Sequence, residues 1–299
     1  MARQPMALQL KALRLALIGR GPWGRTIERT LCALPSVSVT VVARGEAPPR
    51  DPDGVVIATA SATHADVALP YLEAGIPTFI EKPMATNATD AYRICAAAAR
   101  GGGAVFVGHI HLHNPAFRAL LELLPALGAI RAVTCEGMND RPRADASLLW
   151  DWLPHDLSMA LAVFGRFPDR VSAVALGGSP PAQAAVTTFH FGEAPMVSTM
   201  SWVSPVRRQT MTVTGANGTL SFDDKAENKL MLRQGGINSH PAYENELPLT
   251  RELRSFVDAI RAGSTDRSQA ALGTAVVRMI AAAEDSLAQG GAVIKIKAA

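Results

Sequence analysis

The sequence LRLALIGRGPWG occupies residues 13–24. Its first seven residues form an apolar run typical of a β-strand, and a helical pattern begins at Trp23. The glycine spacing between them matches a dinucleotide-binding turn, in which the glycines permit a tight turn, close approach of a pyrophosphate and packing of the helix on the strand. The alternative is a purely structural strand–helix turn. We expect the phosphate-binding segment to consist of Gly19, Arg20, Gly21, Pro22, Trp23 and Gly24.

The first 108 residues alternate between short apolar runs and longer helical patterns. This alternation predicts a parallel sheet with helices on both faces. The expected strands are 13–19, 37–43, 55–59, 78–80 and 104–108, and the expected helices are 23–34, 64–74 and 87–100. The connection from Ala43 to Val55 contains Pro48, Pro49 and Pro52. Proline disfavours a helix, so we expect an extended loop there and few contacts to the adenosine side of a nucleotide.

Beyond residue 108, strand patterns follow one another without helices between them, which is typical of an antiparallel sheet. We expect strands at 129–137, 171–176, 185–191, 196–201, 208–214, 219–222 and 292–297, and helices at 115–124, 147–164 (interrupted near Pro154), 249–262 and 269–288. The predicted fold class is therefore α/β. It comprises a Rossmann domain over residues 1–108 and an α+β domain with a large open, mostly antiparallel sheet over residues 109–299.

Composition excludes several classes of protein. The 299 residues are 48% hydrophobic and 18% charged, which excludes a disordered or fibrous chain. The net charge of +3 is small and scattered, so we expect no nucleic-acid partner. No apolar run is long enough to span a membrane, and we expect a soluble, cytoplasmic protein. Cys32, Cys95 and Cys135 lie too far apart for a disulfide framework or a CxxC metal site, which favours a reducing compartment.

The residue at the end of the second predicted strand bears on the choice of dinucleotide. NAD-binding proteins usually place an acid about 20 residues after the glycines, where it binds the ribose 2′-hydroxyl. Here Arg44 stands at that position, and a guanidinium binds a 2′-phosphate instead. Glu46 lies two residues further and could serve a hydroxyl. The sequence favours NADP, with NAD as the alternative.

Several motifs in order resemble one family. They are Val55-Val56-Ile57-Ala58-Thr59 with His64, Phe79-Ile80-Glu81-Lys82-Pro83, Val107-Gly108-His109, Asn114-Pro115, Leu149 to Asp156, Val213 to Leu220, and Glu252 to Ala262. The chain resembles the glucose–fructose oxidoreductase and inositol dehydrogenase family, Gfo/Idh/MocA. The resemblance implies NAD(P)-dependent chemistry at a hydroxyl carbon of a sugar, cyclitol or nucleotide-sugar, and a second domain that makes homodimer or homotetramer contacts.

The same motifs place candidate site residues at strand ends, where parallel sheets bind ligands. On the cofactor side we expect Thr59, Ala60, His64, Glu81 and Lys82. His64 either contacts the nicotinamide half or only begins a helix. Ala60 stands where the family often has proline.

Three residues match the family's catalytic pattern, namely Lys82, Asp151 and His155. Histidine titrates near neutral pH, which suits it to accept a hydroxyl proton. Asp151 and His155 are four residues apart, so on a helix they share a face and the carboxylate could orient the imidazole. A lysine ammonium would favour the alkoxide and lower the pKa of the base. The alternatives are an exposed lysine and a surface i,i+4 pair.

A second histidine group contains His109, His111 and His113. On a strand these side chains would share one face and could chelate a metal. No nearby carboxylate supplies a third ligand, so we expect no metal and assign the run to the substrate pocket.

These observations predict an NAD(P)-dependent dehydrogenase or reductase that acts on the CH–OH group of a small polyhydroxylated substrate. The alternatives are a reductase of imines or conjugated bonds with the same architecture, a noncatalytic dinucleotide-binding sensor, and a metal-dependent hydrolase built on the histidine run.

Overall fold

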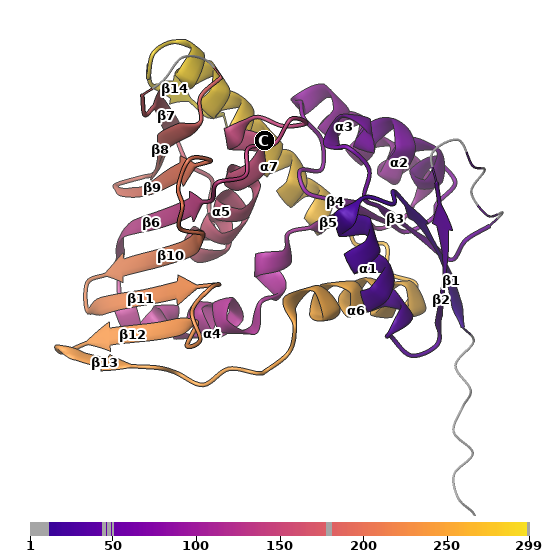
Figure 1. The fold of residues 1–299 in the computed structure, drawn as a ribbon, viewed down its shortest axis with the longest axis horizontal. Helices are drawn as coiled ribbons and strands as arrows, with labels where there is room; N and C mark the ends of the chain where they lie inside the picture. The colour runs from indigo at the N-terminus through magenta and orange to yellow at the C-terminus, as the bar shows by residue number, and fades with distance from the viewer. Residues whose placement is uncertain (1–11, 44–45, 47–48, 50, 178–180, 298–299) are drawn as a thin grey trace, which may run out of the picture.

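The computed structural model describes residues 12–43, 46, 49, 51–177 and 181–297 of the chain. It contains two sheets, and Figure 1 shows them on opposite sides of the molecule. The first sheet has five strands in the order β2-β1-β3-β4-β5, and every neighbouring pair is parallel. Its strands are β1 (Leu13–Ile18), β2 (Val37–Val42), β3 (Gly54–Ile57), β4 (Thr78–Glu81) and β5 (Val105–Gly108). The strand order reverses between β1 and β3, so a ligand crevice is expected at the carboxyl ends of these two strands.

Two apolar clusters cover the two faces of this sheet. On one face, Leu15 and Leu17 of β1 join a cluster with α1 (Pro22–Cys32) and α6 (Pro248–Arg261). On the other face, Ala16 joins a cluster with α2 (His64–Glu73) and α3 (Ala88–Gly101). The alternation along β1 explains the continuous apolar run, because both faces of a parallel sheet are buried.

The connection between β2 and β3 passes over β1, which pairs with both strands. Its described residues contain no helix, as the prolines predict. Short polar contacts hold the ends of this connection: Glu46 Oε2 accepts from the backbone N–H of Ala43 at 2.8 Å, and Asp53 Oδ2 accepts from the backbone N–H of Arg14 at 2.7 Å. These contacts anchor the described parts of the connection to the sheet.

The second sheet has nine strands in the order β13-β12-β11-β10-β6-β9-β8-β7-β14. Only the β6–β9 pair is parallel, so the predicted mostly antiparallel sheet is confirmed. The strands are β6 (Ile130–Met138), β7 (Arg170–Ala175), β8 (Ala184–Phe191), β9 (Ala194–Ser201), β10 (Arg208–Gly215), β11 (Gly218–Asp223), β12 (Leu230–Gln234), β13 (Ile237–Ser239) and β14 (Ile294–Lys295). Strands β12 and β13 were not expected from the sequence, because they are short and largely exposed.

Helices α4 (Pro115–Leu123), α5 (Leu148–Phe164) and α7 (Ser268–Ala288) pack on the second sheet. Buried and half-buried residues alternate along β8 and β9, which indicates that helices cover one face only. The expected interruption of α5 near Pro154 is wrong, because the helix runs unbroken through this residue. Proline removes one N–H donor, and the extensive burial of α5 offsets that loss. Short 3-10 helices are η1 (Ser61–Thr63), η2 (Ile110–His113) and η3 (Leu124–Leu127).

Two helices late in the sequence pack against helices and strands of the part of the chain that forms the first sheet. Helix α6 packs against α1, and α7 packs against α3 and β5. The division into residues 1–108 and 109–299 therefore stays a prediction. No helix in the described ranges is long and apolar enough to cross a membrane.

We predict that Phe256→Ala, in α6, destabilises the fold by about 3–5 kcal/mol, because it opens a cavity in a packed core. The Phe256 ring is fully buried, and its centroid lies 5.8 Å from that of Phe79 and 5.2 Å from that of Phe106. Denaturant unfolding measures the change. Tyr92→Ala is the control, since Tyr92 is 51% exposed and its loss should cost less than about 0.5 kcal/mol. Equal losses in the two variants would contradict the prediction.

Candidate active site

The glycine segment forms a backbone cradle that side chains would obstruct. Gly19 has φ of +114°, and a Cβ added there would lie 2.3 Å from the carbonyl oxygen of Ala58. A Cβ on Gly24 would lie 2.1 Å from the carbonyl oxygen of Gly19. A Cβ on Gly21 would meet nothing within 4 Å. The first glycine and the third are thus required by packing, whereas the second faces open space.

Helix α1 begins directly after Gly21, and no side chain caps its first N–H groups. The start of a helix attracts anions, because its N–H groups are unpaired and its dipole is positive there. The segment therefore fits the pyrophosphate of a dinucleotide.

A cleft of about 1020 Å³ lies between the carboxyl ends of the first sheet and the second sheet. Two lysines, Lys225 and Lys229, line its far wall, where both form ion pairs with Asp224. The cleft gathers eleven of the twelve predicted cofactor residues and the three predicted catalytic residues: Gly19, Arg20, Gly21, Pro22, Trp23, Gly24, Thr59, Ala60, His64, Glu81, Lys82, Asp151 and His155. Arg44, on which the preference for NADP depends, lies outside the described residues.

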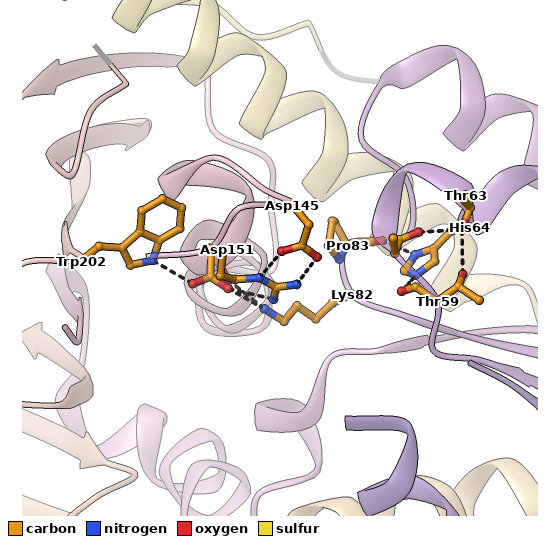
Figure 2. A network of polar contacts seen from close by, with 10 residues as sticks. Thr59, Thr63, His64, Lys82, Pro83, Asp145, Asp151 and Trp202 are labelled. Carbon is orange, nitrogen blue, oxygen red and sulfur yellow. Dashed lines mark hydrogen bonds and ion pairs between the residues drawn. The ribbon is translucent and has the colours of Figure 1, made fainter. Parts of the chain in front are cut away.

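The His64 side chain contacts the backbone just after two neighbouring strands, β3 and β4. It is the first residue of α2 and is 1% exposed. Its Nδ1 lies 2.9 Å from the carbonyl oxygen of Pro83, and its Nε2 lies 3.2 Å from that of Thr59 (Figure 2). Burial lowers the pKa of His64, which opposes the effect of these two contacts. The ring nitrogens are thus directed at backbone, which favours a role in shaping the cofactor wall.

Lys82 connects the first sheet to α5 across the cleft. Its Nζ donates to the backbone carbonyl of Asp151 at 2.9 Å and lies 3.6 Å from Asp151 Oδ1. The two side chains are only 14% and 13% exposed. Burial lowers the pKa of Lys82, the charge of Asp151 opposes this shift, and the charge of Arg143 adds to it.

The Asp151 carboxylate binds three donors, and Figure 2 shows Trp202 and Lys82 converging on it. Trp202 Nε1 donates to Oδ2 at 3.0 Å, and Arg143 donates to Oδ1 at 3.3 Å. No hydrogen bond joins Asp151 to His155 within the described chain, so the expectation that this carboxylate orients the imidazole is wrong. The side chains are neighbours on the helix, but the carboxylate turns toward the cations and the indole N–H.

The His155 imidazole is held by packing. Its ring centroid lies 4.9 Å from that of His111 in an edge-to-face contact, and its Nδ1 is buried without a hydrogen-bond partner. Burial lowers the pKa of His155 well below its usual value, and the nearby charge of Lys82 lowers it further. His155 is therefore neutral at pH 7.

The run containing His109, His111 and His113 differs from the expected strand. It forms the 3-10 helix η2 and the residue before it, so the three rings do not share one face. Burial lowers the pKa of His109 to about 3 and that of His111 to about 4. Of the three, His111 lines the cleft, whereas His109 and His113 do not, so the assignment of the whole run to the substrate pocket is not met. The described residues hold no group of three or more His, Cys, Asp and Glu side chains arranged for a metal ion.

Asp156 anchors the helix turn that carries His155. It is 0% exposed, and its carboxylate accepts from Ser198 Oγ at 2.5 Å and from Gln209 Nε2 at 3.2 Å. Burial raises the pKa of Asp156 to about 7, although both hydrogen bonds oppose the shift. These bonds join α5 to β9 and β10. Asp156 is not among the site residues predicted from the sequence, although an acidic side chain inside an apolar helical pattern is a signal for it.

Comparisons with known proteins identify the class. A family model described as an oxidoreductase family with an NAD-binding Rossmann fold matches residues 27–109, and one described as the GFO/IDH/MocA C-terminal domain matches residues 117–221. A crystal structure of an oxidoreductase from Magnetospirillum magnetotacticum MS-1 is 31% identical, with a TM-score of 0.82 over 91% of this chain and 100% of that chain. These matches place the chain in an oxidoreductase family with an NAD-binding Rossmann fold.

The chain belongs to the Gfo/Idh/MocA family, so the resemblance seen in the sequence motifs is confirmed. UDP-N-acetylglucosamine 3-dehydrogenase of Acidithiobacillus ferrooxidans is 32% identical over 41% of this chain, and the match spans only 39% of that enzyme. An inositol dehydrogenase homologue from Azotobacter vinelandii, solved with NADH and myo-inositol, shares the fold, with a TM-score of 0.82 and 17% identity over 96% of this chain and 98% of that chain.

We predict that two glycine substitutions separate folding from cofactor binding. Gly24→Ala should destabilise the protein by about 1–3 kcal/mol, because its Cβ would overlap backbone. Gly21→Ala should change stability by less than about 0.5 kcal/mol and weaken NADPH and NADH binding about tenfold or more, because its methyl group would occupy space that a pyrophosphate needs. Thermal unfolding without cofactor and fluorescence titration with it measure the two effects. Unchanged cofactor affinity in Gly21→Ala would refute the assignment.

Proposed function

We propose that this protein is an NAD(P)-dependent dehydrogenase that acts on the CH–OH group of a sugar, cyclitol or nucleotide-sugar. The observation that carries the proposal is the position of Lys82. Its ammonium lies in the same cleft as the glycine cradle, bound to Asp151 and close enough to His155 to depress its pKa. The named substrates of the two relatives supply the substrate class.

The proposed roles follow from charge and burial. A bound nicotinamide supplies the hydride acceptor for oxidation or the hydride donor for reduction. The glycine cradle and the start of α1 hold the pyrophosphate. Neutral His155 accepts the hydroxyl proton of the substrate, and the Lys82 ammonium stabilises the oxygen as it becomes an alkoxide. Asp151 holds Lys82 in place and favours its charged form.

We predict that His155→Ala lowers kcat by about 10²–10⁴-fold, the range typical of a lost general base. Its cofactor affinity should barely change, because the imidazole faces the substrate. Lys82→Ala should also be slow and should shift the pH optimum for oxidation upward, because the charge that lowers the pKa of His155 is lost. Asp151→Asn should be milder and should lower the pKa of Lys82, because its anion raises that pKa.

These roles are tested by the pH–rate profiles of the three variants, measured with sugar nucleotides and cyclitols as substrates. His190→Ala is the matched control, since His190 lies on β8 and contacts Arg170 at 3.3 Å. Near-normal turnover of His155→Ala would place the base elsewhere and make Lys82 the first candidate.

We further propose that the enzyme prefers NADP. The support is the presence of Arg44 where NAD-binding proteins usually carry an acid. Arg44→Asp should reverse or flatten the preference, since a charge-assisted contact to phosphate contributes about 1.5–3 kcal/mol, or about 10- to 150-fold in affinity. Fluorescence titration with NADPH and NADH measures it. Equal affinities for both cofactors in the unaltered protein would overturn this choice.

We also propose that copies of the chain associate as a homodimer or homotetramer through the nine-stranded sheet. The face opposite the helices carries half-buried side chains on its central strands. Thr188, Val197 and Thr212 are uncharged, and Glu136 and Arg208 form an ion pair. Sedimentation of the purified protein should show two or four copies, and Thr212→Arg should shift it toward the monomer. A monomeric wild-type protein would refute the proposal.

A further inference from the structure

Two glutamates that the proposed mechanism does not use lie buried behind Lys82. Glu81 ends β4 and is 7% exposed, and Glu252 lies in α6 and is 2% exposed. Both oxygens of Glu252 and the Oε1 of Glu81 are buried without a hydrogen-bond partner. A buried ionised carboxylate without a partner is costly, so three such oxygens in one place require an explanation.

The packing of β4 against α6 brings these two side chains to the same place. Phe79 and Glu81 are two residues apart and lie on one face of β4. Glu252 and Phe256 are four residues apart and lie on one face of α6. The rings of Phe79 and Phe256 are in contact, with centroids 5.8 Å apart. Four helical residues rise about 6 Å and two strand residues about 6.6 Å, so the next pair along the contact is Glu81 with Glu252.

The direction of α6 agrees with this register. Leu249, in its first turn, lines the cleft at the carboxyl ends of the strands, so Glu252 is near the end of β4. Gly108 of β5 provides the room, because a Cβ there would lie 2.9 Å from Glu81 Oε2. The carboxyl groups therefore sit above a wall of aromatic rings and below the cleft.

The elements around Glu252 bring no cation that neutralises it. Burial raises the pKa of Glu252 well above its usual value, and the negative charge of Glu81 raises it further. Burial also raises the pKa of Glu81 to about 7, although Trp23 and Lys82 oppose the shift. Helix η2, which packs on α6, contributes His113, and the residue before η2 is His109; burial lowers the pKa values of both. Helix α1 meets α6 through the apolar residues Ile27 and Leu31.

We propose that Glu252 is a positioning residue, whose carboxyl group keeps its proton and donates it in a hydrogen bond to Glu81. Glu81 then remains an acceptor for the backbone N–H of Lys82, at 3.2 Å from Oε2, and stays next to the Trp23 side chain on the glycine segment. The shared proton thus connects α6 to both the lysine and the cofactor cradle. The role assigned to the pair rests on the proposed function, in which Lys82 acts on the substrate.

Infrared spectroscopy of the cofactor-free protein tests for the proton. At about pH 8, where exposed carboxyl groups are ionised, the wild type should absorb in the carbonyl region of a protonated carboxylic acid. Glu252→Gln should lose this band, because an amide replaces the acid and can donate to Glu81 in its place. Glu122→Gln, which removes an exposed glutamate of α4, is the control and should keep the band. An identical band in the wild type and in Glu252→Gln would overturn the proposal.

The pH dependence of stability gives a second readout that needs neither substrate nor cofactor. When the pKa of a carboxyl group is higher in the folded protein than in the unfolded chain, proton binding favours the folded state. This contribution to stability is fully present below the pKa of the unfolded chain and is lost as the pH rises through the pKa of the folded protein. Between about pH 5 and 8, the wild type should therefore lose more stability than Glu252→Gln. Asp156 contributes equally to both proteins. Parallel stability curves would overturn the proposal.

The positioning role is tested by comparing Glu252→Leu with Glu252→Gln. Glu252→Leu should lower kcat about tenfold or more and shift the part of the pH–rate profile that reports the ionisation of Lys82. Glu252→Gln should restore most of the wild-type kcat and most of the wild-type pH profile. An unchanged pH profile in Glu252→Leu would overturn this role. If Lys82→Ala instead retains turnover, the proposed function fails, while the infrared and stability measurements still decide whether the proton is shared.

Discussion

The ion pair between Lys82 and Asp151 joins the parallel sheet to helix α5 across the cleft, and two further donors bind the same carboxylate. A buried charge that loses its partner destabilises a protein by about 3–5 kcal/mol, so the buried Lys82 ammonium needs the Asp151 carboxylate beside it. Asp151 lies in the first turn of α5, where the helix dipole favours an anion. Arg143 and Trp202 complete its coordination from the preceding loop and from the residue after β9. Three separate segments are thus fixed by one carboxylate.

Much of the fold could be predicted because the signals are local. The apolar run from Leu13 to Ile18, followed by glycines, predicts the strand, the turn and the helix from adjacent residues alone. The predictions failed where tertiary contacts override local preference. Pro154 does not interrupt α5 because packing offsets one missing hydrogen bond. The residues after Gly108 form η2 instead of a strand, and the ring of His111 packs there on α5 and β11.

The candidate site shows the same division. Residues in short motifs at strand ends, such as Lys82 and Thr59, could be placed in the cleft, because the carboxyl ends of parallel strands meet at one edge. The partners of those residues could not be predicted from the sequence. Trp202 lies 51 positions from Asp151, and Glu252 lies 171 positions from Glu81, so no sequence spacing connects them. The helical spacing of Asp151 and His155 correctly predicts that their side chains are neighbours. It does not predict that the carboxylate binds lysine, arginine and tryptophan side chains instead of the imidazole.

The position of α6 has a consequence for the order of events during synthesis. This helix contributes Leu253 and Phe256 to the cluster that covers one face of the first sheet, yet it ends at Arg261. Domains generally form as the chain leaves the ribosome from its N-terminus. Helix α1 covers part of this apolar face early, but the rest stays uncovered until more than 250 residues have emerged. The half of the protein that is made first is therefore among the last to be completed.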